Sequence, residues 1–222
     1  MSTLQALEIT TGNDPDAAVI WLHGLGADGH DFEPVIPELR LPASLAVRFV
    51  FPHAPAIPVT VNNGYVMPAW YDILEMNLDR RVDTAQLRAS AAAVRALVQR
   101  ETGRGIDSRR IVLAGFSQGG AVALETALTH PEPLAGVLLL STYFATADSI
   151  EPHPANAGLP VFIGHGTADP VVPASLGRAA EETLRGLGHP VEHHRYPMEH
   201  SLCLEEIRDL ASWLQQRLAT AT

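Results

Sequence analysis

The chain is an acidic polypeptide of ordinary globular composition. It has 222 residues, of which 46% are hydrophobic and 18% charged, enough to bury a substantial core. Its formal net charge is −10, and all fifteen basic residues are Arg. An acidic chain without a basic run is a poor partner for nucleic acid or an anionic membrane surface. The absence of Lys also excludes a lysine Schiff base or a lysine general base.

Cys203 is the single cysteine, so no disulfide can form within the chain, which fits a reducing compartment. Residues 1–10 lack a basic stretch followed by an apolar core, and this argues against a secretory signal. No apolar run approaches the about 20 residues that span a bilayer. We therefore expect a soluble, cytoplasmic protein.

Short apolar runs alternate with amphipathic stretches, which is typical of βα units around a mostly parallel sheet. The continuous runs suit strands that are buried on both faces. They are 18–23 (AVIWLH), 47–51 (VRFVF), 111–115 (IVLAG), 137–140 (VLLL) and 161–164 (VFIG). Weaker, more exposed strands are predicted over 4–10 and 191–196.

Between the strands, apolar residues recur at helical spacing. This spacing predicts helices over 83–101, 118–129, 174–187 and 204–218, the first of them capped by Asp83 or Thr84. We therefore expect a single α/β domain over residues 1–222, with helices on both faces of the sheet.

The segment 52–81 does not follow this alternation. It is rich in Pro and aromatic residues and has no clear period. A long irregular segment in a compact domain is usually functional or disordered, and Trp70 and Tyr71 argue against disorder. We expect this segment to line a functional site.

A G-x-S-x-G pattern, from Gly115 to Gly119, lies between a predicted strand and a predicted helix. In that context the serine sits on a sharp turn and can act as a nucleophile. The two glycines remove the Cβ atoms that would clash in so tight a turn. The helix N-terminus behind the serine offers free N–H groups to a developing oxyanion. Ser117 is therefore the candidate nucleophile, and an ordinary glycine-rich turn is the alternative.

A serine nucleophile needs a base, and the base needs a carboxylate that orients it. On such a sheet the acid follows the serine in the chain. Asp169 follows the strand 161–164 at its carboxyl end, where open α/β sheets keep their sites. Asp148 and Glu151, after the preceding strand, are alternative acids. A structural role for Asp169 would be to cap the turn before Pro170.

The base should follow the acid and lie in a loop. His200 meets this condition, because it lies between the last predicted strand and the last predicted helix. His189 precedes a proline in a turn. His193 and His194 lie inside a predicted strand and would face opposite sides of the sheet.

The loop 23–29 (HGLGADG) follows the first buried strand, and its glycines let the backbone bend toward a ligand. We expect the N–H of Leu25 to be one oxyanion donor, and the N–H of Gln118, directly after the serine, to be the other. A phosphate loop is disfavoured, because G-K-[ST] is absent. His23 and His165 are expected in the core or the site wall, and their wide separation argues against a metal site.

Together these segments resemble the carboxylesterase/phospholipase family of α/β-hydrolases, which includes the acyl-protein thioesterases. The matching segments, in family order, are LHGLGADG (22–29), MPAWYDI (67–73), IVLAGFSQGGA (111–121), GHGTADPVVP (164–173) and MEHS (198–201).

The resemblance implies an α/β-hydrolase fold with Ser117, Asp169 and His200 as the catalytic triad and Leu25 and Gln118 as the oxyanion hole. It implies hydrolysis of carboxylic esters of short to medium acyl chain, with acyl thioesters and lysophospholipids as further candidate substrates. It also implies that no cofactor is needed and that homodimers are common.

In one respect the sequence departs from the family pattern. Family members often carry Gly immediately before the catalytic His, where this chain has Glu199. A carboxylate beside the imidazole would raise the pKa of the imidazole. We expect Glu199 to point to solvent instead.

Residues 141–160 are too few to form a helical cap domain, so the site should be open. We expect 52–81 and 142–144 to line it, with Trp70 either a wall of the acyl pocket or a core residue. A ligand-binding or receptor-like protein with little turnover is the alternative function. A peptidase or lactonase would use the same machinery.

Overall fold

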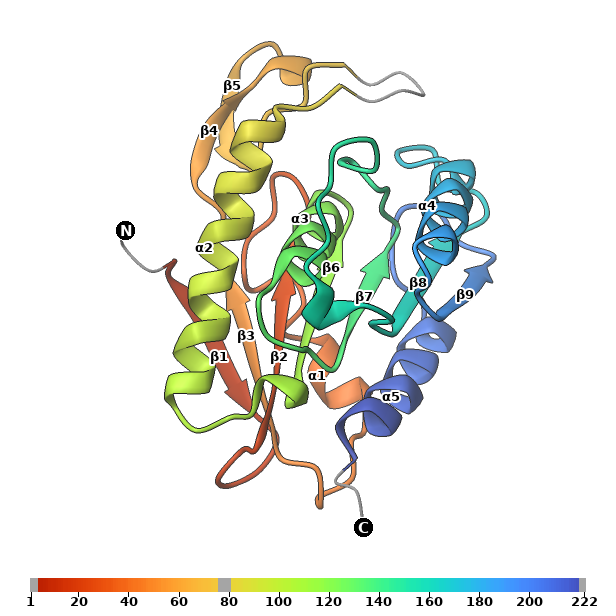
Figure 1. Cartoon of the computed structure of the whole chain (residues 1–222). Coiled ribbons are helices and arrows are strands. Elements are labelled where there is room, and N and C mark those ends of the chain that lie inside the picture. The colour runs from red at the N-terminus through yellow and green to blue at the C-terminus, as the bar shows by residue number, and fades with distance from the viewer. Residues whose placement is uncertain (1–3, 76–80, 220–222) are drawn as a thin grey trace.

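The computed structural model describes residues 4–75 and 81–219, and a seven-stranded sheet forms its centre. Its strands are β1 (Ala6–Thr10), β2 (Ala17–Leu22), β3 (Val47–Pro52), β6 (Ile111–Phe116), β7 (Gly136–Leu140), β8 (Val161–Gly166) and β9 (Val191–Tyr196). They lie in the order β1-β3-β2-β6-β7-β8-β9 (Figure 1). β1 pairs antiparallel with β3, and the other neighbouring pairs are parallel. The predicted mostly parallel sheet is confirmed.

Helices cover both faces of this sheet (Figure 1). The α-helices are α1 (Val35–Glu38), α2 (Thr84–Gly103), α3 (Gln118–Thr129), α4 (Ala174–Gly186) and α5 (Leu204–Leu218). Short 3-10 helices are η1 (Thr60–Asn62), η2 (Ser108–Arg110) and η3 (Pro154–Asn156). Alternate residues of β2 enter two separate apolar clusters, Ile20 with α2 and α3, and Trp21 with α1 and α5. This two-sided burial explains why β2 reads as a continuous apolar run.

The predicted helices all form, with ends shifted by a few residues at most. Asp83 caps α2, because its side chain accepts a hydrogen bond from the N–H of Gln86. The short helix α1 was not predicted. It has four residues, one of them Pro37, and so presents no helical period to recognise.

The segment 52–81 contains regular structure that the sequence analysis did not predict. A hairpin of β4 (Ala56–Val59) and β5 (Tyr65–Pro68) projects beyond the sheet, near the first turns of α2 (Figure 1). Its turn uses left-handed backbone at Asn63 (φ 55°) and Gly64 (φ 74°). Both strands are only four residues long and contain Pro, so their sequences show no clear alternation of apolar and polar residues. The prediction of a wholly irregular segment was therefore wrong; residues 76–80 lie outside the described part of the chain.

The carboxyl ends of the parallel strands share one edge of the sheet, at the top of Figure 1. The loops after β2, β6, β7 and β8 and the loop before α5 therefore meet at this edge. Residues 141–160 add no helix longer than η3, so no large cap domain covers this edge. None of the described helices is long and apolar enough to cross a membrane.

Candidate active site

Ser117 lies on the predicted sharp turn between β6 and α3. Its backbone is strained, with φ 53° and ψ −121°. A Cβ on Gly115 would overlap the backbone of Gly119, and one on Gly119 would lie 2.5 Å from the carbonyl oxygen of His23. The two glycines of the motif are therefore required by the close approach of β6, α3 and the loop after β2.

A hydrogen bond from the turn after β7 holds the serine in this conformation. The hydroxyl of Thr142 donates to the carbonyl oxygen of Ser117 over 2.6 Å, and the N–H of Ser117 donates to Leu140 over 2.9 Å. The Thr142 side chain also packs against Gly120, where a Cβ would not fit. Local backbone strain at Ser117 is thus balanced by contacts from a neighbouring strand.

Asp169 and His200 meet at the same edge of the sheet. His200 Nδ1 lies 2.7 Å from Asp169 Oδ2. The other carboxylate oxygen, Oδ1, accepts hydrogen bonds from the N–H groups of Val171 and Val172, each over 2.8 Å. Asp169 is buried. Its carboxylate is therefore fixed by backbone donors on one side and presents its other oxygen to the imidazole.

Ser117 and His200 line one pocket of about 270 Å³. No hydrogen bond joins the Ser117 hydroxyl to His200 within the described residues. In serine hydrolases this bond often forms fully only in the complex with substrate. The ring of His200 packs on Phe116, with centroids 4.6 Å apart. The residues that line this pocket are Gly24, Leu25, Ala27, Asp31, Ile73, Phe116, Ser117, Gln118, Tyr143, Val171 and His200.

Both expected oxyanion donors line the same pocket. Within the described part of the chain, the backbone N–H groups of Leu25 and Gln118 donate to no other residue. Gln118 is the first residue of α3, where the helix dipole adds a partial positive charge. The two amides are thus available to an oxygen that develops negative charge.

His23 fixes the peptide that carries the Leu25 amide. Its Nε2 accepts from the N–H of Ala54 over 3.1 Å, so its Nδ1 bears the hydrogen and donates to the Gly24 carbonyl oxygen over 2.8 Å. That carbonyl belongs to the same peptide unit as the Leu25 N–H. Burial lowers the pKa of His23, against opposing contributions from the Gly24 carbonyl, Asp28 and Asp31, and so favours the neutral ring.

Trp70 lies behind the oxyanion donors. It is buried and does not line the pocket. Its indole N–H donates to the His23 carbonyl over 2.9 Å, and its backbone N–H donates to Gln118 Oε1 over 2.8 Å. The side-chain NH₂ of Gln118 in turn donates to the Tyr71 carbonyl oxygen over 2.7 Å. Of the two roles predicted for Trp70, a wall of the acyl pocket or a core residue, its burial and these hydrogen bonds favour the core.

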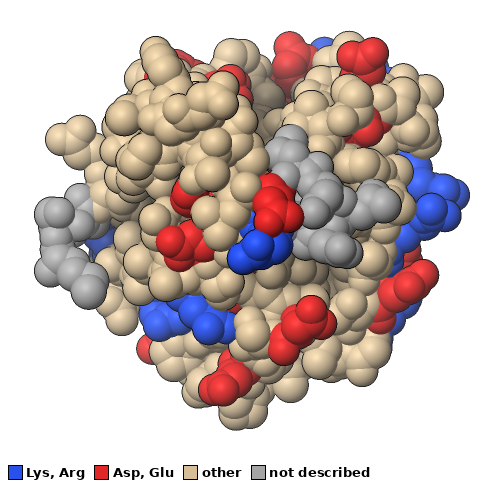
Figure 2. All heavy atoms as spheres, turned by 90° about the horizontal axis from the view of Figure 1, so that it is seen from above, with Lys and Arg blue, Asp and Glu red and all other residues tan. Residues whose placement is uncertain are grey.

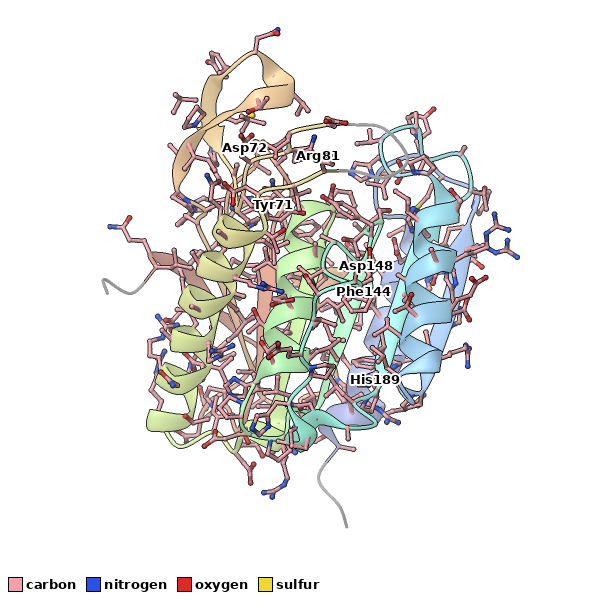
Figure 3. The ribbon with its side chains drawn as sticks, turned by 45° about the horizontal axis from the view of Figure 1, so that its top comes forward. Tyr71, Asp72, Arg81, Phe144, Asp148 and His189 are labelled. Carbon is pink, nitrogen blue, oxygen red and sulfur yellow. The ribbon has the colours of Figure 1, made fainter. Side chains whose placement is uncertain are left out.

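The alternative acids do not approach His200. Asp148 is exposed, and Figure 3 places it below the level of Tyr71 and Asp72. Glu151 is exposed and lines a different hollow, beside α2 and α3. Of the carboxylates considered from the sequence, Asp169 is the one bonded to His200.

The alternative bases also lie elsewhere. His189 precedes β9 at the amino end of the parallel strands, well below Tyr71 and Asp72 in Figure 3, whereas Ser117 follows β6 at the carboxyl end. His193 bonds Glu181 of α4, whereas His194 stacks on Phe162, so the two face opposite sides of the sheet as predicted.

His165 and Glu199 flank the acid–base pair without joining it. His165 is buried, and its Nε2 bonds the Val172 carbonyl over 2.8 Å, behind Asp169. Burial lowers the pKa of His165. Glu199 is exposed, as expected. Across the described residues, no group of three or more His, Cys, Asp or Glu is placed to hold a metal ion.

The structure adds pocket residues that the sequence analysis did not name. Asp31, Ile73 and Val171 line the pocket. Val171 could have been found from its place two residues after Asp169 at a strand end. Asp31 gives no such signal, because its position depends on how the long loop after β2 folds back over Phe116.

A mostly parallel sheet in this strand order, with a serine between β6 and α3 and a carboxylate–imidazole pair in later loops, defines the α/β-hydrolase class of enzymes. Within this class, the chain belongs to the Phospholipase/Carboxylesterase family, whose sequence model matches residues 4–218. The family expected from the sequence motifs is thus confirmed.

Individual relatives agree with this assignment. The chain is 41% identical to acyl-protein thioesterase 1 of Neurospora crassa, over 91% of this chain and 87% of that protein. It is 42% identical to acyl-protein thioesterase 1 of Mycosarcoma maydis, over 97% of this chain and 98% of that protein.

Solved structures share the fold. The crystal structure of Arabidopsis thaliana SOBER1 superposes with a TM-score of 0.84 at 30% identity, over 91% of this chain and 99% of that chain. Zea mays acyl-protein thioesterase 2 superposes with a TM-score of 0.82 at 26% identity, over 97% of this chain and 99% of that chain.

Proposed function

We propose that this protein hydrolyses carboxylic esters and acyl thioesters of short to medium acyl chain through an acyl-enzyme on Ser117. The observation that carries the proposal is that Ser117, His200, Leu25 and Gln118 line one pocket, with Asp169 hydrogen-bonded behind His200. A whole-chain hydrolase domain over residues 1–222 is part of this proposal.

The first half of the reaction forms the acyl-enzyme. Asp169 accepts a hydrogen bond from the N–H at His200 Nδ1, which leaves Nε2 free to take the proton of the Ser117 hydroxyl. The serine oxygen attacks the carbonyl carbon, and the N–H groups of Leu25 and Gln118 bind the resulting oxyanion. The carbonyl re-forms, the bond to the alcohol or thiol breaks, and His200 gives its proton to that leaving group.

The second half releases the acid. His200 Nε2 takes a proton from water, and the water oxygen attacks the acyl carbon on Ser117. The same two amides bind the second oxyanion. The bond to the serine oxygen then breaks, and His200 returns the proton to Ser117.

The pocket supports substrates of modest acyl length. Its volume of about 270 Å³ lies just below the about 300–1,000 Å³ that is usual for small-molecule sites. Its side walls come from Ile73 and Tyr143, in the segments 52–81 and 142–144 that the sequence analysis expected to line it. We include thioesters among the proposed substrates because relatives at about 40% identity are named acyl-protein thioesterases. Lysophospholipids are included because hydrolysis of their ester bond needs the same chemistry.

Hydrolysis of p-nitrophenyl esters and acyl thioesters graded by acyl length tests this proposal. Wild type should exceed Ser117→Ala by about 10³-fold or more, because a serine hydrolase without its nucleophile keeps only residual catalysis. Ser44→Ala, in an exposed turn remote from the pocket, is the matched control and should retain wild-type rates. Equal rates for wild type and Ser117→Ala on every ester would favour the receptor-like alternative.

A further inference from the structure

The pocket contains one carboxylate that the proposed mechanism does not use. Asp31 lines the pocket, as do Leu25 and Ala27. Its side chain forms no ion pair or hydrogen bond within the described residues. The other carboxyl group of the site, on Asp169, is fully engaged. Asp31 is therefore a negative charge that lines the substrate space and has no ion-pair or hydrogen-bond partner among residues 4–75 and 81–219.

The backbone of this residue is well fixed although its side chain is exposed. The next residue, Phe32, is buried and stacks on Trp21, with ring centroids 5.1 Å apart. The N–H of Asp31 donates to the Asp28 carbonyl over 3.2 Å. The carboxylate is thus presented from an anchored turn, which reduces the entropy lost when a charged group pairs with it.

Ring contacts connect the residue after Asp31 to the histidine side of the pocket. Phe32 packs on Phe116 with centroids 5.8 Å apart, and Phe116 packs on His200 at 4.6 Å. In the proposed reaction His200 protonates the departing oxygen or sulfur, so the leaving group must lie on this side. Ile73 and Tyr143 supply uncharged walls of the pocket and suit the acyl chain.

Among the described residues, no large charged patch surrounds the pocket edge on the face that Figure 2 shows. Figure 2 looks onto the edge where the carboxyl ends of the strands lie, and most of the atoms in view belong to uncharged residues, with separate acidic and basic groups between them. Asp31 should therefore attract a cationic group only over a short distance, as expected for one exposed carboxylate in salt solution.

We infer that Asp31 is a specificity-determining residue that favours esters and thioesters whose alcohol or thiol part carries a positive charge. The inference rests on the proposed function, because it needs His200 to define the leaving-group side. The chemistry of the cation is a substituted ammonium or a guanidinium, and it can belong to a small alcohol or to a basic side chain next to an acylated cysteine.

The test compares two esters that differ only in charge. Butyrylcholine carries a trimethylammonium group, and 3,3-dimethylbutyl butyrate replaces its nitrogen with carbon. The ratio of their kcat/KM values should fall by about two- to fivefold in Asp31→Asn, the range expected for losing one exposed charge pair. Glu33→Gln, which removes the same charge two residues away but does not line the pocket, should keep the wild-type ratio.

The outcomes separate the inference from the proposed function. An unchanged ratio in Asp31→Asn both for this pair and for the peptide pair described below, with the substrates hydrolysed, overturns the inference alone. If neither ester turns over, the ratio is taken from their inhibition constants against p-nitrophenyl butyrate. Failure to hydrolyse that ester as well, along with the rest of the graded panel, would overturn the proposed function and the inference with it.

A second pair of substrates distinguishes the source of the cation. S-butyryl-cysteine peptides with Arg or the neutral citrulline beside the cysteine are measured in the same variants. A fall in the charged-to-neutral ratio for both pairs supports recognition of either source. A fall for one pair alone supports the inference and identifies the source that reaches Asp31.

Discussion

His200 Nδ1 lies 2.7 Å from Oδ2 of Asp169, while Oδ1 of the same carboxylate accepts two backbone hydrogen bonds. An ionised carboxylate can only accept, so this contact fixes the hydrogen of the imidazole on Nδ1. Nε2 is then the atom that can accept a proton in the pocket. The orientation and the tautomer of His200 thus depend on Asp169.

Asp169→Asn should lower kcat by about 10²- to 10⁴-fold, because the amide can place an N–H against Nδ1 and favour the wrong tautomer. The amide oxygen can still accept from Val171 and Val172, so the midpoint of thermal unfolding should change little. Steady-state kinetics and thermal melts check both statements. A kcat within about tenfold of wild type would remove Asp169 from the mechanism.

The bond from Thr142 to the Ser117 carbonyl should control the turn that presents the nucleophile. Thr142→Val keeps the shape of the side chain but removes the donor, and we expect kcat to fall by about tenfold with little change in KM. Thr142→Ser retains the hydroxyl and should restore most of the rate. Equal rates for the Val and Ser variants would show that the hydrogen bond plays no part in positioning Ser117.

The parts of the fold that the sequence predicted are those that local pattern and chain order determine. Buried strands read as apolar runs, and the turn at Ser117 needs glycines at fixed positions whatever the rest of the chain does. Asp169 and His200 were selected by their order in the chain and their place at strand ends. The structure places them in hydrogen-bond contact.

The parts that were missed depend on packing between distant segments. The sequence is compatible with Trp70 in the pocket wall or in the core, and its two hydrogen bonds to the residues behind the oxyanion donors favour the core. The hairpin 56–68 has strands too short for a readable period. Asp31 enters the pocket because Phe32 packs on Phe116, a contact across 84 positions (116 minus 32) that no local pattern encodes.

His130 should make the fold sensitive to acid. It is buried, and burial lowers its pKa to about 4, with smaller contributions from Arg95 and His153. The unfolded chain, with a pKa near 6.5, binds the proton first, so stability is lost as the pH falls from about 6.5 to 4, by up to about 3 kcal/mol. His130→Leu should therefore lose less stability than wild type between pH 7 and about 4.5 in urea unfolding. Parallel losses in the two proteins would contradict this prediction.

Glu206 should make the fold less stable as the pH rises, which is the opposite of the effect of His130. Burial and the nearby Asp209 raise its pKa to about 8, against an opposing contribution from the Cys203 backbone. The folded chain keeps this proton after the unfolded chain has lost it, so stability falls as the pH rises from about 4.5 to about 8, by about 1.4 kcal/mol per pH unit at most.

Glu206→Gln should therefore be more stable than wild type at pH 8, with a smaller difference at pH 5.5. The exposed neighbour Glu205 provides the control, because Glu205→Gln is the same substitution at an exposed site and should show no such trend. Urea unfolding at both pH values measures the difference in stability between each variant and wild type. A stability difference that does not grow with pH would show that Glu206 is not held protonated in the fold.

The central claim is that the substrate acyl group is transferred to Ser117, and trapping this intermediate tests it most directly. The enzyme is mixed with p-nitrophenyl butyrate, quenched in acid during turnover and digested, and the peptides are analysed by mass spectrometry. We expect one butyryl group on the peptide that contains Ser117, and none in Ser117→Ala. A butyryl group on another residue of the wild-type protein, or undiminished turnover by Ser117→Ala, would contradict the account.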